Sequence, residues 1–212
     1  MKFYDCATAP SPRRVRIFIA EKGVEIPVVQ VDLRSGEQLG EAFRAKNPRC
    51  TVPVLELDDG TCLTETVAIC DYLDSVYPQP SLMGRTPKER ALVLQWNHWI
   101  EDLGFLSVAE VLRNSFPGFK DRALPGPDAF EQIPALAERG RRRIGQFWAL
   151  LDRQLGANAW VAGDAFTMVD ISALVVCDFA QRVKLAMPEE CAALRAWHGR
   201  AAARPSSSGS VL

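Results

Sequence analysis

The chain has 212 residues, of which 48% are hydrophobic and 24% charged, and its 25 basic and 26 acidic side chains give a formal net charge of −1. This composition is typical of a globular protein and argues against disorder, collagen and repeat arrays. Nucleic acid and anionic membranes are not expected as main partners, because binding to them draws on clustered Lys and Arg. The sequence has no apolar signal-peptide core at its start and no apolar run of the roughly 18 to 20 residues that a bilayer helix needs, so we expect a cytoplasmic protein.

Two groups of chemically active side chains are expected to be structural. The one dense basic run covers residues 139–143 and lies among apolar residues at helical spacing, which indicates a solvated helix face. The six cysteines form no C-x-x-C pair and have no histidine-rich spacing beside them, so neither a metal site nor a dithiol redox motif is predicted. Most thiols are expected to be small buried hydrophobic groups.

The first eighty residues alternate strand and helix signals at short intervals. Residues 2–4 predict a strand, and residues 11–23 carry apolar positions at helical spacing that end in a C-cap glycine. Residues 27–33 are rich in β-branched side chains and predict a second strand. Residues 37–47 then predict a short helix.

Two strands and a helix complete this region. Residues 51–57 and 61–65 predict strands joined by a hairpin turn at residues 58–60, and residues 66–77 predict a helix. The resulting order, βαβαββα, combines a parallel βαβ unit with an antiparallel hairpin. Thioredoxin-like folds have this layout, so we expect an α/β domain over residues 1–80.

The rest of the chain predicts helices and almost no strand. Residues 81–86 concentrate Pro, Gly and Ser and are expected to form a linker, followed by an all-helical domain over residues 87–212. The segment 166–183 is apolar on nearly all sides, which indicates a central buried helix. Thr167 and Asp170 form a predicted capping box at its start.

Pro53 is the first candidate for a functional residue. It lies in the sequence TVPVL at the start of a predicted strand, where proline removes a ladder donor. A cis Val52–Pro53 bond would turn the Val52 main chain outward and expose its N–H and C=O to a peptide-like ligand. An ordinary trans proline on an edge strand is the alternative, and the sequence leaves both open.

The pair Glu65 and Thr66 is the second candidate, at the point where the last strand meets the helix that begins near Val67. A hydroxyl and free main-chain N–H groups at a helix N-terminus favour a carboxylate, while a glutamate favours an ammonium group. Together they would recognise the two charges of an amino-acid head group. A simple N-cap beside a solvated acid is the alternative.

Ser11 is the third candidate. Its place directly before Pro12 is typical of an N-cap followed by the first helical residue. Its hydroxyl is available either to cap that helix or to face a ligand.

Taken in order, these features resemble the glutathione transferase superfamily. The shared pattern is a thioredoxin-like domain with a Val-Pro motif, an acidic and hydroxyl pair that opens its last helix, a proline-containing linker, and an all-helical domain with an F-T-x-x-D capping box. The resemblance covers essentially the whole chain. It implies a homodimer with glutathione as co-substrate.

The resemblance also implies roles for individual residues. It places Val52 and a cis Pro53 against the cysteinyl backbone of glutathione, and Glu65 with Thr66 around its γ-glutamyl end. Gln38 falls where many relatives carry His or Gln near the glycyl carboxylate.

The chain departs from the family at the residue that activates the thiol. Ala9 stands where serine-type relatives carry their serine, and Pro10 beside it leaves no cysteine for a cysteine-type enzyme. A tyrosine-type enzyme would need Tyr4, which is expected to lie within the first strand. A bacterial class often called eta looks similar through its A-P-x-P-R-R-V-R-I-F loop, lacks all three residues and is thought to use an arginine.

Three side chains therefore remain as candidates for stabilising a glutathione thiolate: Arg34, Thr8 and Ser11. Arg34 is favoured because a permanently charged guanidinium stabilises a thiolate without proton transfer. The alternative is that Arg34 merely pairs with Asp32 or Glu37 on the surface.

The resemblance implies a glutathione transferase that joins the glutathione thiolate to hydrophobic electrophiles, with thiol-dependent peroxidase activity as a second reaction at the same site. A non-catalytic glutathione-binding or ligand-binding protein, or a dimerisation module, is the alternative, which Ala9 favours. Residues 1–80 carry 9 basic and 12 acidic side chains. An anionic tripeptide would therefore have to be held by local donors such as Arg34 and Gln38, since the overall charge of this region gives no help.

Overall fold

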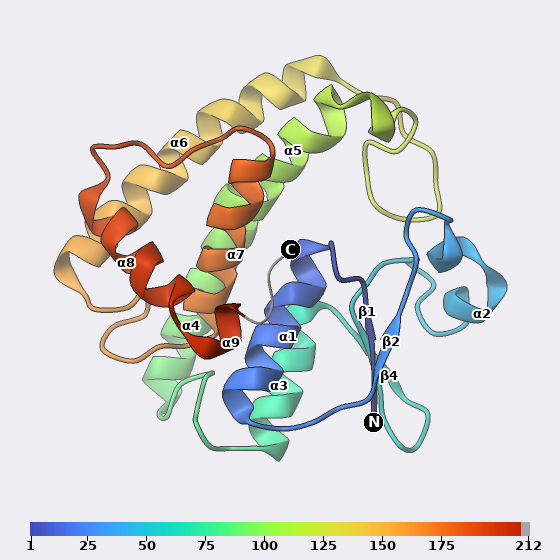
Figure 1. Cartoon of the computed structure of the whole chain (residues 1–212), viewed down its shortest axis with the longest axis horizontal. Coiled ribbons are helices and arrows are strands. Elements are labelled where there is room, and N and C mark those ends of the chain that lie inside the picture. Colours follow the sequence, from blue (N-terminus) through green and yellow to red (C-terminus); the bar gives the residue numbers. More distant parts are fainter. Residues whose placement is uncertain (209–212) are drawn as a thin grey trace. The chain divides into compact units, whose positions relative to one another are not determined.

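The computed structural model describes residues 1–208, so residues 209–212 of the predicted helical domain lie outside the described residues. The described chain divides into two compact units (Figure 1). The first contains Met1–Ser81, Pro125–Asp128 and the described residues from Ser206 on, and the second contains Leu82–Leu124 and Ala129–Pro205.

The first unit is built on a four-stranded mixed sheet. Its strands, in chain order, are β1 (Lys2–Asp5), β2 (Val28–Gln30), β3 (Val54–Glu56) and β4 (Cys62–Thr64). Their order across the sheet is β2-β1-β3-β4, with β2 parallel to β1 and the β3–β4 hairpin antiparallel. The predicted α/β fold is therefore confirmed, including the turn that closes on Gly60 at φ 86°.

Two helices of this unit, α1 (Pro10–Lys22) and α3 (Thr66–Val76), lie side by side in Figure 1 and are in contact. Helix α1 ends as predicted at Gly23, whose left-handed conformation lets its N–H reach the Ala20 carbonyl at 3.1 Å. The amide of Val24 then bonds to the Ile19 carbonyl, which closes the end of the helix.

The prediction of one helix over residues 37–47 is wrong. The segment forms a 3₁₀ turn, η1 (Glu37–Leu39), and a four-residue helix, α2 (Glu41–Arg44). Gly40 lies between them in an extended conformation. Its carbonyl accepts the first hydrogen bond of α2, from the Arg44 N–H at 2.9 Å. Glycine loses more conformational freedom in a helix than any other residue, which favours a break at this position. The spacing of the apolar residues did not reveal the break.

Lys22 ties three parts of the first unit together. Its fully buried ammonium group donates to the Asp74 carboxylate at 2.5 Å, to the Tyr77 carbonyl at 2.7 Å and to the Pro80 carbonyl at 2.5 Å. All three donors of one lysine are thus used. The ends of α1 and α3 and the chain that follows α3 are held at one point.

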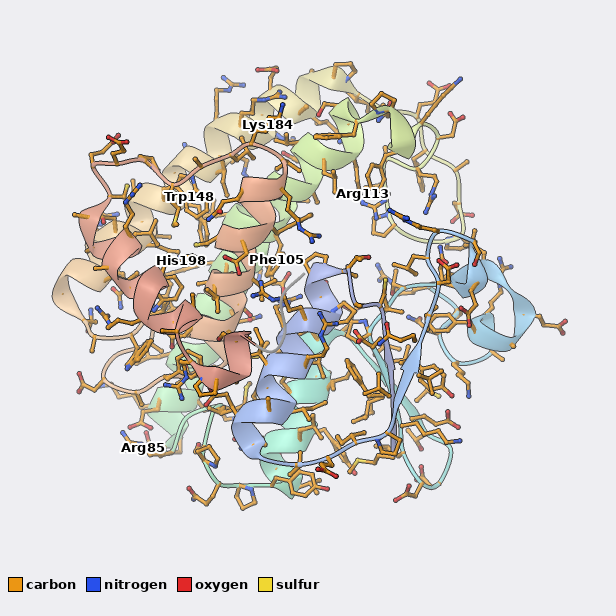
Figure 2. All side chains as sticks on the ribbon, viewed as in Figure 1. Arg85, Phe105, Arg113, Trp148, Lys184 and His198 are labelled. Carbon is orange, nitrogen blue, oxygen red and sulfur yellow. The ribbon has the colours of Figure 1, made fainter. Side chains whose placement is uncertain are left out.

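The second unit is all-helical among the described residues. Its longer elements are α4 (Pro87–Trp99), a π-helical turn η2 (Ile100–Phe105), α5 (Leu106–Ser115), α6 (Pro134–Ala157), α7 (Met168–Arg182) and α8 (Ala192–Ala202). A short 3₁₀ turn, η3 (Pro117–Phe119), follows α5. The last helix, α9 (Pro205–Ser208), follows α8, and its residues from Ser206 on belong to the first unit. Phe105 and Trp148 are among its buried aromatic side chains (Figure 2). No helix within residues 1–208 is both long enough and apolar enough to cross a membrane.

Helix α7 is the predicted central helix, and twelve of its residues are buried. Its predicted capping box is present: Asp170 accepts from the Thr167 N–H at 3.0 Å and from the Thr167 hydroxyl at 3.2 Å. The same carboxylate also accepts from the Val161 N–H at 2.9 Å and from the Trp197 indole at 3.0 Å. Burial raises the pKa of Asp170 to about 6, although each of these donors favours the ionised form.

The basic run on α6 forms a charged helix face, as predicted. Arg139 pairs with Glu110, Arg141 with Glu138 at 2.6 Å, and Arg143 with Asp102 at 2.8 Å. Three arginines of this run therefore form ion pairs with carboxylates of the second unit. The six cysteines are free, and five of them are buried, which also agrees with the sequence analysis.

Candidate functional site

The Val52–Pro53 bond is cis, which settles the alternative that the sequence left open. Pro53 is buried directly before β3, while Val52 is half-buried. Outside the helices and strand ladders, no hydrogen bond within residues 1–208 uses the Val52 N–H or C=O. These two groups are suited to pairing with the main chain of an extended ligand.

The start of α3 agrees with the helix predicted over residues 66–77. Thr66 is the first helical residue, and the exposed Glu65 is the N-cap. Glu65 has φ 67° and ψ 127°, a conformation that costs a non-glycine residue about 1–3 kcal/mol. Its side chain makes no cap hydrogen bond, so its carboxylate is not engaged by its own helix.

The Thr66 hydroxyl is occupied by the protein itself. The oxygen accepts from Arg14 Nη2 at 3.2 Å and donates its proton to the Ser11 carbonyl at 3.5 Å. A hydroxyl has one proton to donate, and the proton of Thr66 is already directed at the Ser11 carbonyl, so it is not available to a ligand. The main-chain N–H groups of the first turn of α3 are the groups that an anion could still use.

Ser11 is the second residue of α1 and sits between Pro10 and Pro12. Of the first three helical residues it alone has an N–H, because proline has none. Its hydroxyl oxygen accepts from Arg14 Nη2 at 3.4 Å, and no acceptor within residues 1–208 takes its proton. One buried guanidinium therefore links the hydroxyl of Ser11 with that of Thr66.

Arg14 was not among the predicted site residues. Its side chain is only 3% exposed, which is unusual for arginine. The available signal was its spacing from Ser11, because residues three apart on a helix are neighbours. Its contact with Thr66 joins positions 52 residues apart and is a property of the fold.

Arg34 and Thr8, the other two candidates for stabilising a thiolate, are exposed. The Arg34 main-chain N–H donates to Asp32 Oδ1 at 2.9 Å, and this bond lowers the pKa of Asp32. The Arg34 guanidinium forms no ion pair within 4 Å inside the described chain, although its charge is a smaller cause of the lowered pKa of Asp32. The Thr8 hydroxyl lies 3.5 Å from the Cys6 thiol.

Gln38 lies on η1 and is buried, although it was expected to face a carboxylate. Its side-chain carbonyl oxygen has no hydrogen-bond partner within residues 1–208. No hydrogen bond within residues 1–208 joins Gln38 to Val52, Glu65 or Ser11. Arg14 joins Ser11 with Thr66, and no hydrogen bond within the described chain links the Arg34 or Gln38 side chain to this cluster.

Tyr4 lies in β1, as expected, and its hydroxyl is engaged. It donates to Glu56 Oε2 at 2.6 Å, and Lys46 donates to the same carboxylate at 2.8 Å. Burial and the bond to Glu56 raise the pKa of Tyr4. The hydroxyl proton of Tyr4 is thus committed to Glu56 and is not available to a thiolate.

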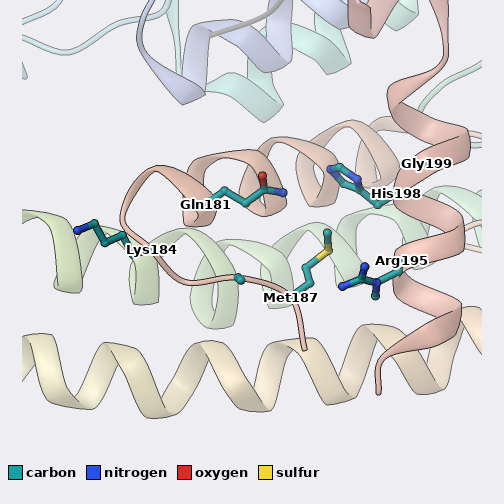
Figure 3. A pocket seen from close by; sticks show the side chains of 7 residues that line it. Gln181, Lys184, Met187, Arg195, His198 and Gly199 are labelled. Atoms are coloured by element: carbon teal, nitrogen blue, oxygen red, sulfur yellow. The ribbon is translucent and has the colours of Figure 1, made fainter. Parts of the chain in front are cut away.

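The second unit has an open pocket of about 630 Å³ that the sequence did not suggest. It lies between the end of α7 and α8, and Figure 3 shows Gln181, Met187, Arg195 and His198 turned toward one another. His198 Nε2 is 2.8 Å from Asp178 Oδ1. None of the residues predicted for the functional site lines this pocket.

Both units match family models. Residues 8–76 match the glutathione S-transferase N-terminal domain, and residues 134–200 match the glutathione S-transferase C-terminal domain. Glutathione S-transferase 2 of Saccharomyces cerevisiae is 38% identical over 209 residues, which are 97% of this chain and 87% of that protein. The chain belongs to the glutathione S-transferase family.

Solved structures of this family agree over almost the full length. The crystal structure of Gtt2 from Saccharomyces cerevisiae covers 100% of both chains with a TM-score of 0.91 at 37% identity. A glutathione S-transferase domain-containing protein from Marinobacter aquaeolei VT8 gives a TM-score of 0.91 at 40% identity, covering 98% of this chain and 100% of that one. The transferase fold and glutathione as co-substrate, predicted from the resemblance, are confirmed.

The family also contains proteins named for other reactions. A maleylacetoacetate isomerase of Pseudomonas aeruginosa is 30% identical over 193 residues, 88% of this chain and 84% of that protein. Family membership therefore supports a glutathione-dependent enzyme in general. It does not by itself choose the second substrate.

Proposed function

We propose that this transferase binds glutathione in its first unit, stabilises the thiolate and joins it to hydrophobic electrophiles. The observation that carries the proposal is the bridge made by Arg14 Nη2 between Ser11 Oγ at 3.4 Å and Thr66 Oγ1 at 3.2 Å. It brings a hydroxyl at the start of α1 next to the start of α3, the two helix N-termini that the resemblance assigns to glutathione.

Glutathione is held in this proposal mainly by main-chain groups. The Val52 N–H and C=O pair with the cysteinyl residue, and the cis Pro53 keeps them turned outward. The γ-glutamyl carboxylate takes the main-chain donors at the start of α3, because the Thr66 hydroxyl is occupied. Glu65 holds the γ-glutamyl ammonium. Gln38 donates from its amide nitrogen to the glycyl carboxylate.

The thiol must lose a proton for the reaction. A free thiol with a pKa near 8.5 is mostly protonated at neutral pH, and lowering that pKa by two units requires about 2.7 kcal/mol of preferential stabilisation. The Ser11 hydroxyl accepts from the Arg14 guanidinium, and a hydroxyl polarised in this way is a stronger donor to a thiolate. The Ser11 N–H at the N-terminus of α1 adds a second donor.

Ser11, Arg34 and Thr8 remain the candidates for stabilising the thiolate, and Ser11 is favoured because its hydroxyl accepts from the Arg14 guanidinium. We expect Ser11→Ala to lower kcat/KM with chlorodinitrobenzene about 100-fold, the loss typical of removing one well-placed donor. Arg34→Ala is expected to have a small effect. Arg44→Ala serves as its matched control, since Arg44 is another exposed arginine of the first unit.

The thiol pKa of bound glutathione provides the direct check. It is read from the ultraviolet absorbance of the thiolate as a function of pH, and it should rise in Ser11→Ala. A rise in Arg34→Ala with none in Ser11→Ala would return the role to Arg34. Retention on immobilised glutathione should persist in both variants, because the substitutions change side chains only and leave every proposed main-chain donor, including the N–H of residue 11, in place.

A non-catalytic glutathione-binding or ligand-binding protein is the second candidate function, and Ala9 favours it. Ala9 is the N-cap of α1 and makes no side-chain hydrogen bond, so no side chain is placed there to activate a thiol. Calorimetric binding of glutathione without turnover of electrophiles or organic hydroperoxides would support this function. A homodimer is proposed in either case, and sedimentation velocity tests it.

A further inference from the structure

The segment between β1 and α1 is held by three polar side chains that come from three different elements. Asp5 is the last residue of β1, Gln30 is the last residue of β2, and Arg16 lies in the second turn of α1. Asp5 and Gln30 are register partners in the parallel β1–β2 pair, so their side chains lie next to each other on one face of the sheet.

The Asp5 carboxylate orients the other two side chains. Asp5 is 1% exposed, and each of its oxygens has one donor. Arg16 Nη1 donates to Oδ1 at 2.5 Å, and Gln30 Nε2 donates to Oδ2 at 2.7 Å. Hydrogen bonds to an ionised acceptor are the strong ones, so both partner side chains are fixed at their ends.

The free ends of these two side chains hold a single loop residue, Ala7. The Ala7 N–H donates to Gln30 Oε1 at 3.0 Å, and the Ala7 carbonyl accepts from Arg16 Nη2 at 3.0 Å. Next to it, the Cys6 carbonyl accepts from Arg16 Nη1 at 3.4 Å and from the Ala9 N–H at 2.9 Å. The loop is thus secured through its main chain, without any requirement on its own side chains.

The pattern needs an amide at position 30. The Gln30 nitrogen faces Asp5, which leaves the oxygen for the Ala7 N–H. A carboxylate at this position would repel Asp5 and could not donate to it, and an apolar side chain could do neither. Since Gln30 lies on an exposed edge strand, packing of a core does not explain its place.

We propose that Asp5, Arg16 and Gln30 form a clamp that positions residues 7–9, and through them the start of α1, for stabilising the glutathione thiolate. The inference rests on the proposed function. The three residues are positioning residues, because their hydrogen bonds go to the loop and to one another. Residues 7–9 lead directly into the N-cap Ala9 and the donors of Ser11.

The clamp couples the loop to the helix that it precedes. Arg16 belongs to α1 and reaches back to Ala7, so the helix itself sets where the chain enters it. A shift of about 1 Å in a positioned donor can cost on the order of 100-fold in rate. Loss of the clamp should therefore change thiolate stabilisation more than it changes the fold.

A reciprocal swap tests the clamp. Asp5→Asn alone places two amide nitrogens face to face, and Gln30→Glu alone places two carboxylates face to face. In the double variant, the Asn nitrogen donates to one Glu oxygen, the other Glu oxygen accepts from Ala7, and the Asn oxygen still accepts from Arg16. Every hydrogen bond is restored with the net charge of the natural protein.

We expect each single variant to lower kcat/KM for glutathione at least ~10-fold and to raise the thiol pKa of bound glutathione. The double variant should return both close to the natural values. Gln95→Glu, at an exposed position of α4, is the control for the added charge and should change neither. Unfolding in urea is measured for each variant, and Gln30→Leu replaces Asp5→Asn if that variant does not fold.

The outcomes separate the clamp from the proposed function. If the natural protein binds no glutathione, the proposed function fails. The clamp is then tested alone by the rate of hydrogen exchange at the Ala7 amide. A faster rate in each single variant and the natural rate in the double variant support the clamp, and an unchanged rate in the single variants overturns it. If the natural protein turns glutathione over, unchanged thiol pKa values in the single variants, or no restoration in the double, overturn the clamp.

Discussion

Asp5 in the first unit and Asp170 in the second are the two aspartates within residues 1–208 that are at most 1% exposed, and they have different roles. Asp170 in the second unit is 0% exposed, and its four donors are neutral groups around the start of α7. Asp5 in the first unit is 1% exposed, and its donors are a guanidinium and a side-chain amide whose other ends hold a loop.

The difference between their donors distinguishes a buried carboxylate that stabilises the fold from one that positions a loop. Asp170 satisfies main-chain and indole groups of the core that have no other partner, so its loss should be felt as loss of stability. Asp5 reaches the loop only through Arg16 and Gln30, and its loss should be felt at the glutathione site. Variants that separate stability from activity can break or sharpen this comparison.

The largest effect is expected at Asp170. Asp170→Ala leaves buried donors of Val161, Thr167 and Trp197 without an acceptor, at about 1–3 kcal/mol for each unsatisfied group. We expect the free energy of unfolding to fall by about 4 kcal/mol, since neighbouring losses do not add fully. Urea unfolding followed by tryptophan fluorescence measures it, and Asp164→Ala at an exposed position is the control.

Lys22 sharpens the comparison, because it shows that the first unit also has a structural charge. Lys22→Met keeps the length of the side chain but leaves the buried Asp74 carboxylate and two carbonyls without this donor. Breaking a buried ion pair typically costs about 3–5 kcal/mol. We expect a loss near the lower end, measured by urea unfolding, with glutathione affinity of the folded protein unchanged. A loss below that of exposed Lys88→Met would contradict the assignment.

The pH dependence of stability tests the Asp170 carboxylate from another side. Burial places its folded-state pKa at about 6, above the ordinary aspartate value of 3.8, so the folded state binds this proton more tightly. The contribution of Asp170 to the free energy of unfolding therefore falls as the pH rises from about 4 to 6 and is constant above that window, by about 3 kcal/mol in total.

Asp170→Asn removes this titration and should flatten the dependence between pH 4 and 6 relative to the natural protein. Asp164→Asn is the matched control. An equal slope in the natural protein and in Asp170→Asn would show that other groups produce the dependence.

Much of the fold could be predicted from local patterns, and the site only in part. The C-cap at Gly23, the capping box of Thr167 and Asp170 and the buried α7 follow from spacing within one element. The break at Gly40 was missed, because one apolar stripe can span two short helices.

The cluster at the start of α1 shows why the site was harder. Ser11 and Thr66 were found as isolated hydroxyls, but the guanidinium between them was not. The clamp on Ala7 joins residues 9 to 25 positions apart, and only strand register and helix packing bring them together. No local spacing rule reports such contacts.

The smallest effects on stability are expected at two glycines of α6, where close packing rather than a polar group is changed. Gly140 lies on α6 where a Cβ atom would be 2.5 Å from the Ser107 carbonyl of α5 and 3.0 Å from Glu110 Cβ. Gly145, five residues further along α6, has open space where its Cβ atom would lie. In Gly140→Ala, overpacking of about 1–3 kcal/mol opposes the helix gain of about 1 kcal/mol, and we expect net destabilisation. Gly145→Ala should stabilise by up to about 1 kcal/mol. Opposite signs in thermal unfolding would identify the α5–α6 contact as tight, whereas stabilisation by both variants would contradict it.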